Sequence, residues 1–197
     1  GNELRRNGLV NRAKEKYLEC QRLDPDRYEP YLALGELYAD SGLNLPALSA
    51  FEKACKLKPN NYEIIMNIGR MHQKLGKMHY AKEFFAQAEA LKYNEAEPKY
   101  YLGLIAYESK EFDSAESYAL DALRVNPNYH KAMALCGLAR IRLNRLKPAR
   151  DIYESLYAKA PNGSSIKNHA RQKIWEITKR MAPAQYHSVE DAVEVQE

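Results

Sequence analysis

Apolar residues recur along this chain at the three- and four-residue spacing that marks one face of a helix. Residues 28–61 contain two such stripes, separated by the common helix stop Ser41-Gly42, and Pro46 then suits the first turn of a second helix. Proline also ends most of the later pairs, because the residue before a proline disfavours helix. The pattern predicts four helix pairs: 29–41 with 45–57, 62–75 with 78–91, 97–109 with 112–124, and 130–143 with 146–159.

The helix pairs repeat with a fixed period of 34 residues. Glycine occupies one column of this frame, at Gly1, Gly35, Gly69, Gly103 and Gly137. Alanine occupies a second column, at Ala13, Ala47, Ala81, Ala115 and Ala149. A bulky ring follows at Tyr17, Phe51, Phe85 and Tyr153, with Ala119 as the exception, and a proline column is broken only by Tyr93. A period of this length is the signature of stacked repeats.

These columns resemble the tetratricopeptide repeat, whose 34-residue unit combines a large residue, Leu-Gly, Tyr, Ala, Phe, Ala and Pro. Residues 28–61 carry nearly the full set, namely Tyr31, Leu34, Gly35, Tyr38, Ala47, Phe51, Ala54 and Pro59. The chain departs from the pattern at His72, Ala106, Arg140, Lys99 and Tyr93. The resemblance implies an all-α fold, a right-handed superhelical solenoid of helix-turn-helix units with a C-terminal capping helix.

We expect one solenoid over residues 1–181, because a single helix pair cannot bury its apolar face alone. It would comprise a partial repeat at 1–27, full repeats at 28–61, 62–95, 96–129 and 130–163, and a capping helix at 164–181. Residues 182–197 form an acidic tail that is either mobile or docked elsewhere. Because the chain starts inside a repeat, we expect a fragment of a longer protein, unless Gly1 is an expression scar.

The small residues are expected to serve packing. Glycine and alanine would face each other across a helix pair so that the two backbones approach, and the rings Tyr17, Phe51, Phe85 and Tyr153 would fill the space between successive units. Pro98 is expected at the start of its helix, in compensation for Tyr93. Either Tyr100 or Tyr101 is expected to compensate in the core for Lys99, which leaves the role of Tyr100 open between core and surface.

Residues that support catalysis or metal binding form no recognisable motif. The five histidines have no metal-ligand spacing, and no nucleophile, phosphate-binding or dinucleotide motif occurs. The three cysteines lack paired or zinc-binding spacing, which favours small buried residues in a reducing compartment. His72 lies in an aromatic column, so we interpret it as a packing residue. The sequence therefore predicts no enzyme, no cofactor and no metal.

The family resemblance implies that the first helix of each unit lines a concave, partner-binding groove. The expected lining is Leu32, Glu36, Ala39, Met66, Arg70, Gln73, Tyr100, Leu104, Tyr107, Ala134, Leu138 and Ile141. Some relatives bind the C-terminal carboxylate of chaperones through lysines and asparagines in this groove, and Asn67, Arg70 and Lys74 match that clamp only in part. We therefore expect a partner that presents an amphipathic helix or an extended apolar segment.

Charge is distributed unevenly. Residues 130–163 carry seven basic and two acidic side chains, whereas residues 96–129 carry three basic and six acidic ones. The expected basic patch comprises Arg140, Arg142, Arg145, Lys147, Arg150, Lys167, Arg171 and Lys173. Three interpretations stay open: a solvated face, a surface for an acidic protein segment such as the chain's own tail or that of a neighbouring copy, and a weak, salt-sensitive nucleic-acid site.

The sequence thus predicts a non-enzymatic scaffold or adaptor that holds a peptide, an amphipathic helix or an acidic segment of a partner protein. Nucleic acid is the less favoured partner, and no small-molecule substrate or membrane span is expected. The alternative is a regulatory or substrate-recruiting module of a larger enzyme or assembly machine. The compartment is unknown from the sequence, and the cytoplasm is the interpretation that we favour.

Overall fold

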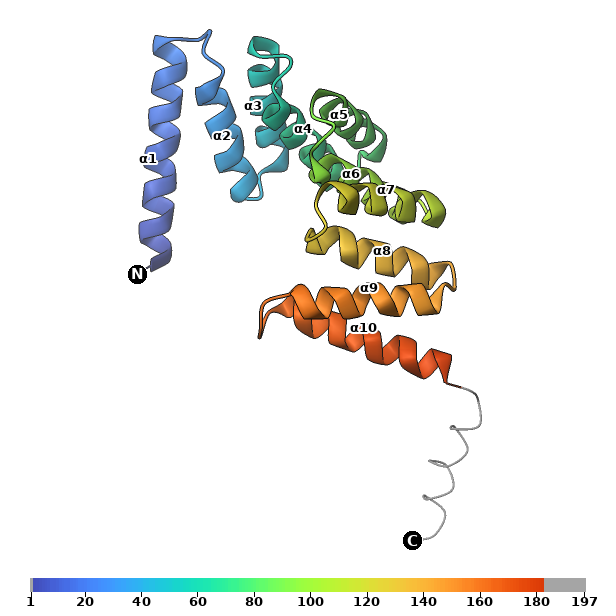
Figure 1. Cartoon of the computed structure of the whole chain (residues 1–197). Helices are drawn as coiled ribbons and strands as arrows, with labels where there is room; N and C mark the ends of the chain where they lie inside the picture. The colour runs from blue at the N-terminus through green and yellow to red at the C-terminus, as the bar shows by residue number, and fades with distance from the viewer. Residues whose placement is uncertain (1, 183–197) are drawn as a thin grey trace. The chain divides into compact units, whose positions relative to one another are not determined.

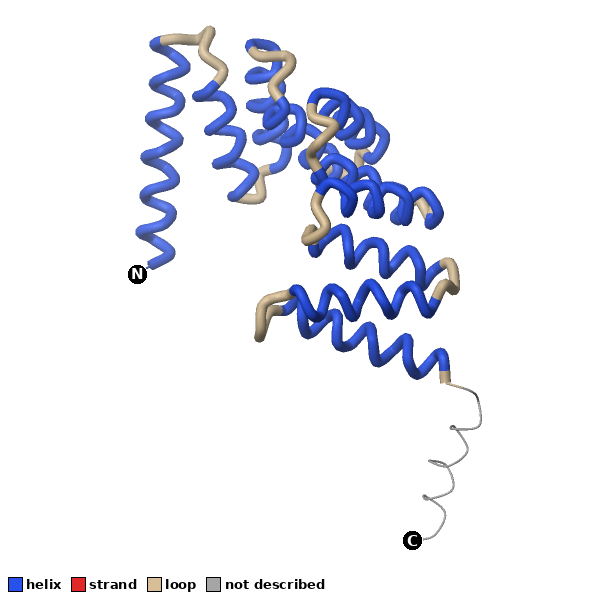
Figure 2. Tube along the Cα trace, in the orientation of Figure 1, coloured by secondary structure: helices blue, strands red, loops and turns tan. Residues whose placement is uncertain are grey.

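The computed structural model describes residues 2–182, with side chains from residue 11 onward, and it contains only helices and loops over that range (Figure 2). The helices, labelled in Figure 1, are α1 (Asn2–Leu23), α2 (Glu29–Asp40), α3 (Asn44–Leu57), α4 (Tyr62–Lys74), α5 (Met78–Leu91), α6 (Ala96–Glu108), α7 (Phe112–Val125), α8 (His130–Arg142), α9 (Leu146–Lys159) and α10 (Ser165–Met181). The predicted all-α class is confirmed, and the four predicted helix pairs match to within one residue at each end.

The partial repeat differs from the full ones, because its residues form the single continuous helix α1 and not a helix pair. Helix α1 contains no proline, and its one glycine, Gly8, costs the helix only about 1 kcal/mol relative to alanine. That cost is too small to end a helix by itself.

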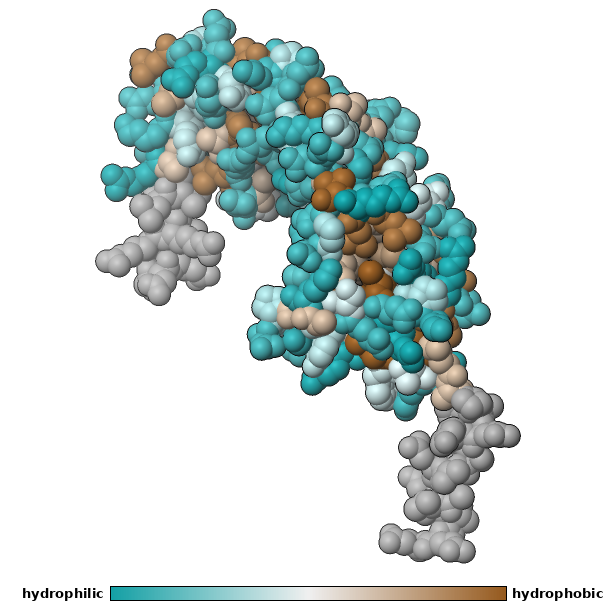
Figure 3. Space-filling model, in the orientation of Figure 1, coloured by the Kyte–Doolittle hydropathy of each residue, from teal (hydrophilic) through white to brown (hydrophobic). Residues whose placement is uncertain are grey.

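The chain divides into two compact units, residues 1–102 and 103–197, and each is described by itself. In the first unit, α1 to α5 pack in chain order, each against the next. Its core includes Leu48, Phe51, Ile64 and Ile68, which are buried between α3 and α4. In the second unit, α7 to α10 pack in the same way, and Met133, Tyr153, Leu156 and Ile177 form the core between α8, α9 and α10. The visible surface is mostly hydrophilic, with apolar area in the region of α7 and α8 (Figure 3).

The periodic glycines make room for rings, which corrects the expectation that glycine faces alanine. A Cβ atom added at Gly35 would lie 2.5 Å from the Phe51 ring. Added at Gly69, it would lie 2.7 Å from the Phe85 ring, and at Gly137 it would lie 2.5 Å from the Tyr153 ring. Each ring belongs to the same repeat as its glycine, so the rings fill the space within a helix pair. The physical reason is that a ring can lie directly against a helix backbone only at a residue without a side chain.

The turns inside the helix pairs share one geometry with the same period. Gly42, Gly76, Lys110 and Asn144 all have positive φ, between 57° and 76°. The residue after each of them donates its backbone N–H to the carbonyl five residues earlier, as Leu43 does to Tyr38 at 2.9 Å and Arg145 does to Arg140 at 2.8 Å. This is a Schellman ending, which satisfies carbonyls at the helix C-terminus. Sequence reasoning identified only the first of these turns by its glycine, and in two of the other three repeats lysine and asparagine replace glycine.

Lys99 and Tyr93 both depart from the repeat pattern, and they contact each other within the first unit. Lys99 lies 2.9 Å from a Glu89 carboxylate oxygen and donates a hydrogen bond of 2.8 Å to the Tyr93 carbonyl. Tyr101 stacks on Phe85 with ring centroids 4.6 Å apart, so it is the tyrosine that compensates in the core for Lys99. Pro98 is fully buried in the first turn of α6, as expected.

Candidate functional site

The first helices of the repeats, α2, α4, α6 and α8, carry the residues predicted to bind a partner. In the first unit, Glu36 is exposed, whereas Leu32, Ala39, Arg70, Gln73 and Tyr100 are half-buried. Met66 is only 1% exposed, so it offers no surface and the prediction for this residue is wrong. Residues on both sides of it in α4, from Ile64 to Gly69, are buried as well.

Arg70 is already engaged by other groups of the first unit. Its guanidinium donates to the Asn67 side-chain oxygen at 2.9 Å and to Glu97 at 2.6 Å, and it lies over the Tyr101 ring. Asn67 and Arg70 are two of the three residues, with Lys74, that match a carboxylate clamp in part. Because Glu97 supplies a carboxylate from within the unit, a partner's carboxylate would have to displace it.

The remaining surface of the first unit is acidic near Glu36. Partial burial raises the pKa of Glu36, and repulsion from Glu63 and Asp40 raises it further. A raised carboxyl pKa means that the site disfavours additional negative charge. This surface is therefore polar and poorly suited to an acidic segment.

In the second unit, three predicted residues meet in one hollow. Tyr107, Leu138 and Ile141 line a cavity of about 200 Å³ together with Arg142 from the end of α8 and four residues of α10. The α10 residues are Lys173, Glu176, Ile177 and Arg180. The lining thus combines four apolar or aromatic residues with three basic side chains and the carboxylate of Glu176. Leu104 and Ala134, also half-buried, lie outside this lining.

The walls of the hollow are held by local packing. Tyr107 packs against Ala106, Ala115 and Ala139 and meets the Phe112 ring edge-on at 5.4 Å. Arg142 lies over the Phe112 ring, with its guanidinium carbon 4.5 Å from the ring centroid. Lys173 is 2.7 Å from Glu176, and this pairing lowers the pKa of the Glu176 carboxyl. The hollow is preformed on helices, which suits it to binding.

The predicted basic residues occupy different settings within the second unit. Arg140 donates to Glu116 at 2.7 Å and to the Pro148 carbonyl at 3.0 Å. Arg145 binds Glu116 as well and lies 2.9 Å from Asp113. Burial by itself would raise the pKa of Glu116, but hydrogen bonds from the two arginines outweigh burial and hold it below its usual range. Two of the eight residues of the expected patch, Arg140 and Arg145, are thus paired with acidic side chains of α7.

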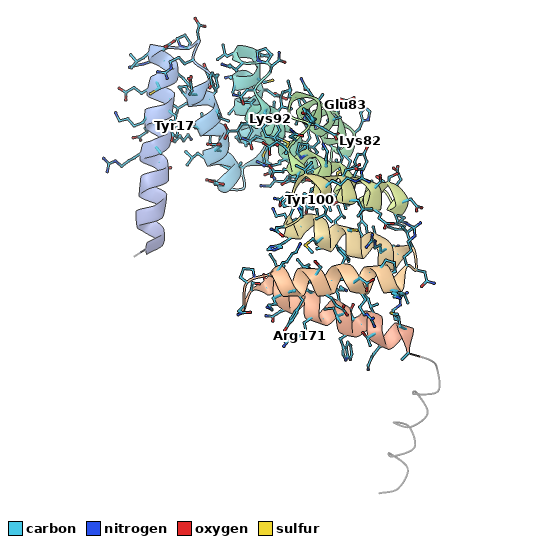
Figure 4. All side chains as sticks on the ribbon, viewed as in Figure 1. Tyr17, Lys82, Glu83, Lys92, Tyr100 and Arg171 are labelled. Carbon is cyan, nitrogen blue, oxygen red and sulfur yellow. The ribbon has the colours of Figure 1, made fainter. Side chains whose placement is uncertain are left out.

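The other basic residues are spread over α9 and α10. Arg150 lies 3.3 Å from Glu154, and Lys167 donates to Asn162 at 2.9 Å while covering the Tyr157 ring. Lys147 and Arg171 are exposed, and neither has an ion-pair partner among the described residues; Figure 4 labels Arg171 on α10.

Sequence reasoning missed Glu116 and the α10 side of the hollow. A signal for the first was present, because the acidic excess of residues 96–129 directly precedes the basic excess of residues 130–163. Ile177 lies in residues 164–181, which the sequence assigned only to a capping helix. Arg180 gave no signal, since its relation to Tyr107 depends on how α10 packs against α8.

The predictions on metal binding, membrane spans, His72 and the cysteines can be compared with the described residues. Between residues 2 and 182, no group of three His, Cys, Asp or Glu side chains could hold a metal ion. None of the helices in that range is both long and apolar enough to cross a membrane. His72 is buried and stacks on Tyr80 and Phe84. Of the cysteines, only Cys136 is buried, so the prediction of buried cysteines is wrong for Cys20, which is exposed, and for the half-buried Cys55.

Comparison with known proteins explains this organisation. Tetratricopeptide repeat models match residues 28–61, 62–95 and 100–164, which is more than half of the chain. The chain belongs to the tetratricopeptide repeat family. The matched residues coincide with the helix pairs described above, and the family is one of protein-interaction folds.

One relative by sequence is the peroxisomal targeting signal receptor of Saccharomyces cerevisiae (strain ATCC 204508 / S288c), which is 28% identical over 161 residues. The alignment covers 74% of this chain but only 26% of the receptor, so the chain spans about a quarter of that protein.

Solved structures show the same fold. A MamA protein aligns with a TM-score of 0.70 at 24% identity and covers 81% of this chain and 87% of its own. The first tetratricopeptide repeat domain of Spaghetti (RPAP3), solved with an HSP90 peptide, aligns with a TM-score of 0.57 at 23% identity, over 62% of this chain and 96% of its own.

Proposed function

We propose that this chain is a non-enzymatic adaptor that binds an amphipathic peptide or helix of a partner protein on the first-helix surface of its second unit. The hollow lined by Tyr107, Leu138, Ile141 and Ile177 carries the proposal, because it joins apolar area with basic side chains on rigid helices. A partner would insert apolar side chains into the hollow and place acidic ones beside Arg142 and Arg180. This is helix-in-groove recognition.

Two comparisons support a peptide as the partner. A structure of the same fold was solved with a bound HSP90 peptide, and a relative by sequence is a targeting signal receptor. The engaged state of Arg70 argues against a carboxylate clamp in the first unit of this chain. The partner therefore differs from a ligand held mainly by its terminal carboxylate.

Replacement of Leu138 by glutamate tests this proposal. The change places a negative charge in the apolar floor and would repel an acidic segment, so we expect capture of the partner from native lysate to fall at least about tenfold, the effect of about 1.4 kcal/mol. Leu45→Glu is the matched control, since Leu45 is 63% exposed on α3 and lies outside the hollow. Mass spectrometry would identify and quantify the captured protein. If both variants capture it equally well, the hollow is not the site.

The alternative function is a recruiting module within a larger enzyme or assembly machine. The short coverage of the targeting signal receptor, 26% of its length, favours this possibility, because there the repeats are one part of a longer protein. The sequence of the complete source protein, with or without a catalytic domain, would decide between the two functions.

Nucleic acid is disfavoured as the partner. Arg140 and Arg145 are bound to carboxylates of α7, so phosphate contacts would require breaking these pairs. We expect no binding of DNA or RNA even at low salt, where phosphate contacts are strongest.

A further inference from the structure

The hollow of the second unit has chemistry that a particular segment of this chain would complement. Its accessible apolar lining is Tyr107, Leu138 and Ile141, backed by the buried Ile177, and Arg142, Lys173, Glu176 and Arg180 complete the lining. Glu176 is held by Lys173 and by the Gln172 amide at 3.0 Å, and Arg180 has no ion-pair partner among the described residues. An occupant needs an apolar face and at least two acidic groups beside that face.

The sequence after α10 has this composition. Residues 183–197 contain four acidic side chains, Glu190, Asp191, Glu194 and Glu197, and no lysine or arginine. Val189, Ala192 and Val193 recur at the spacing of one helical face. On a helix the four acidic residues would lie together on the opposite and flanking sides of that face. These residues lie outside the described part of the chain, so their position is an inference.

The place where the tail begins makes binding within one molecule geometrically simple. Helix α10 ends at Met181, directly after Arg180, and four of its residues line the hollow. Pro183 follows and disfavours continuation of the helix. Fifteen residues span up to about 50 Å when extended, whereas the 17-residue α10 is about 25 Å long. The tail is therefore long enough to turn and run back along α10 over the hollow.

We infer that residues 189–197 of the chain's own C-terminal tail bind in the hollow of the second unit, with Val189, Ala192 and Val193 against its apolar lining. Glu190 and Glu197, which flank this face on a helix, then lie beside Arg142 and Arg180. A short tether holds such a segment at an effective concentration in the millimolar range, so weak contacts suffice for occupancy. An external partner would have to displace the tail. The tail contact goes beyond the proposed function and does not depend on it, because it can be measured without any partner.

Photo-crosslinking in the full chain tests this contact. Tyr107 is replaced by p-benzoylphenylalanine, the purified protein is irradiated, and cross-linked peptides are mapped by mass spectrometry. We expect cross-links to residues 187–197 in a species that migrates as a monomer on a denaturing gel. The matched control carries the same probe at Tyr80, which is 52% exposed on α5, and reports random encounters with the tail.

Tail variants keep the result interpretable, because they change no residue of the described helices. With the probe at Tyr107, Val189→Gln with Val193→Gln removes the apolar face and keeps the charge. Glu190→Gln with Glu197→Gln removes the flanking charge and keeps the apolar face. Each is expected to lower the yield of tail cross-links about tenfold, to the level of the Tyr80 probe, through loss of about 1.4 kcal/mol.

The inference is overturned by equal yields from the Tyr107 and Tyr80 probes, by yields that the tail variants leave unchanged, or by tail cross-links found only in dimers. The last result would assign the tail to a neighbouring copy. Equal partner capture by Leu138→Glu and Leu45→Glu overturns only the proposed function, so the two failures are distinguishable.

Discussion

The first unit and the second unit are built from the same kind of repeat, yet the surfaces of their first helices differ in chemistry. In the first unit, the available positions are occupied by a polar network of Asn67, Arg70 and Glu97 and by the acidic Glu36. In the second unit, the corresponding helices frame an apolar hollow with basic side chains around it. A repeat frame therefore determines where side chains stand, whereas the side chains that the frame leaves variable determine what each unit can bind.

The two units also bury their ion pairs to different depths, and the largest expected effect comes from this difference. The Glu116 side chain is 11% exposed and serves two arginines, whereas the Glu97 side chain is 34% exposed and serves one. We expect Glu116→Gln to lower the free energy of unfolding by about 3 kcal/mol, because the Arg140 side chain, which is only 18% exposed, loses its carboxylate partner. Glu97→Gln should cost about 1 kcal/mol or less. Urea denaturation measures both free energies of unfolding. Equal losses for Glu116→Gln and Glu97→Gln would contradict this distinction between the units.

Glycine-to-alanine changes test whether the shared frame depends on rings. In the repeats of Gly35, Gly69 and Gly137 a ring occupies the space next to the glycine, whereas the repeat of Gly103 has Ala119 in the ring column. A Cβ at Gly137 would lie 2.5 Å from the Tyr153 ring, so Gly137→Ala should cost about 2 kcal/mol despite its better helix propensity. At Gly103 the nearest contact would be 3.0 Å, to the Tyr118 Cβ, and we expect a smaller loss. Thermal melting followed by circular dichroism would rank the two variants, and a larger loss at Gly103 would contradict the ring explanation.

The lowered pKa of Glu116 predicts a pH dependence for the second unit. A carboxyl whose folded pKa lies below its unfolded pKa of about 4.3 contributes stability above that value and loses it as the pH falls through the folded pKa. The difference in free energy of unfolding between the wild type and Glu116→Gln should therefore be constant near pH 7 and shrink as the pH falls below about 4. Denaturant titrations at a series of pH values would measure it. A difference that stays constant down to pH 3 would contradict the assigned role of this carboxylate.

The smallest expected effect concerns the turns. Gly42 and Gly76 supply the positive φ in the first unit, whereas Lys110 and Asn144 adopt it in the second. Since glycine adopts this conformation without a steric penalty, Lys110→Gly should stabilise the protein by up to about 1 kcal/mol. Asn144→Gly should gain less, because asparagine tolerates the left-handed region better than lysine does. A loss of stability in Lys110→Gly would show that another contact of the lysine outweighs the turn.

The family frame and the helix boundaries could be predicted because they depend on local properties. Helical stripes, prolines and glycines report directly on backbone conformation, and five copies of one column make the period unmistakable. Side-chain exposure was harder to predict. Met66 stands in a column expected to line a groove but is buried, because the side chains packed around a residue decide its exposure. Arg70 was expected to be free to bind a partner but binds Glu97, which is 27 residues away in the sequence.

By itself, the sequence determined the all-α class, the repeat period, the helix pairs and the role of the periodic glycines as packing devices. Only the tertiary structure decided that those glycines face rings, that Glu116 takes up two of the predicted basic residues, and that α10 completes a hollow with Tyr107, Leu138 and Ile141. The physical reason is one of range. Backbone preference and periodicity act over a few residues and can be read along the chain, whereas burial and charge pairing depend on distances between helices, which are set when those helices pack.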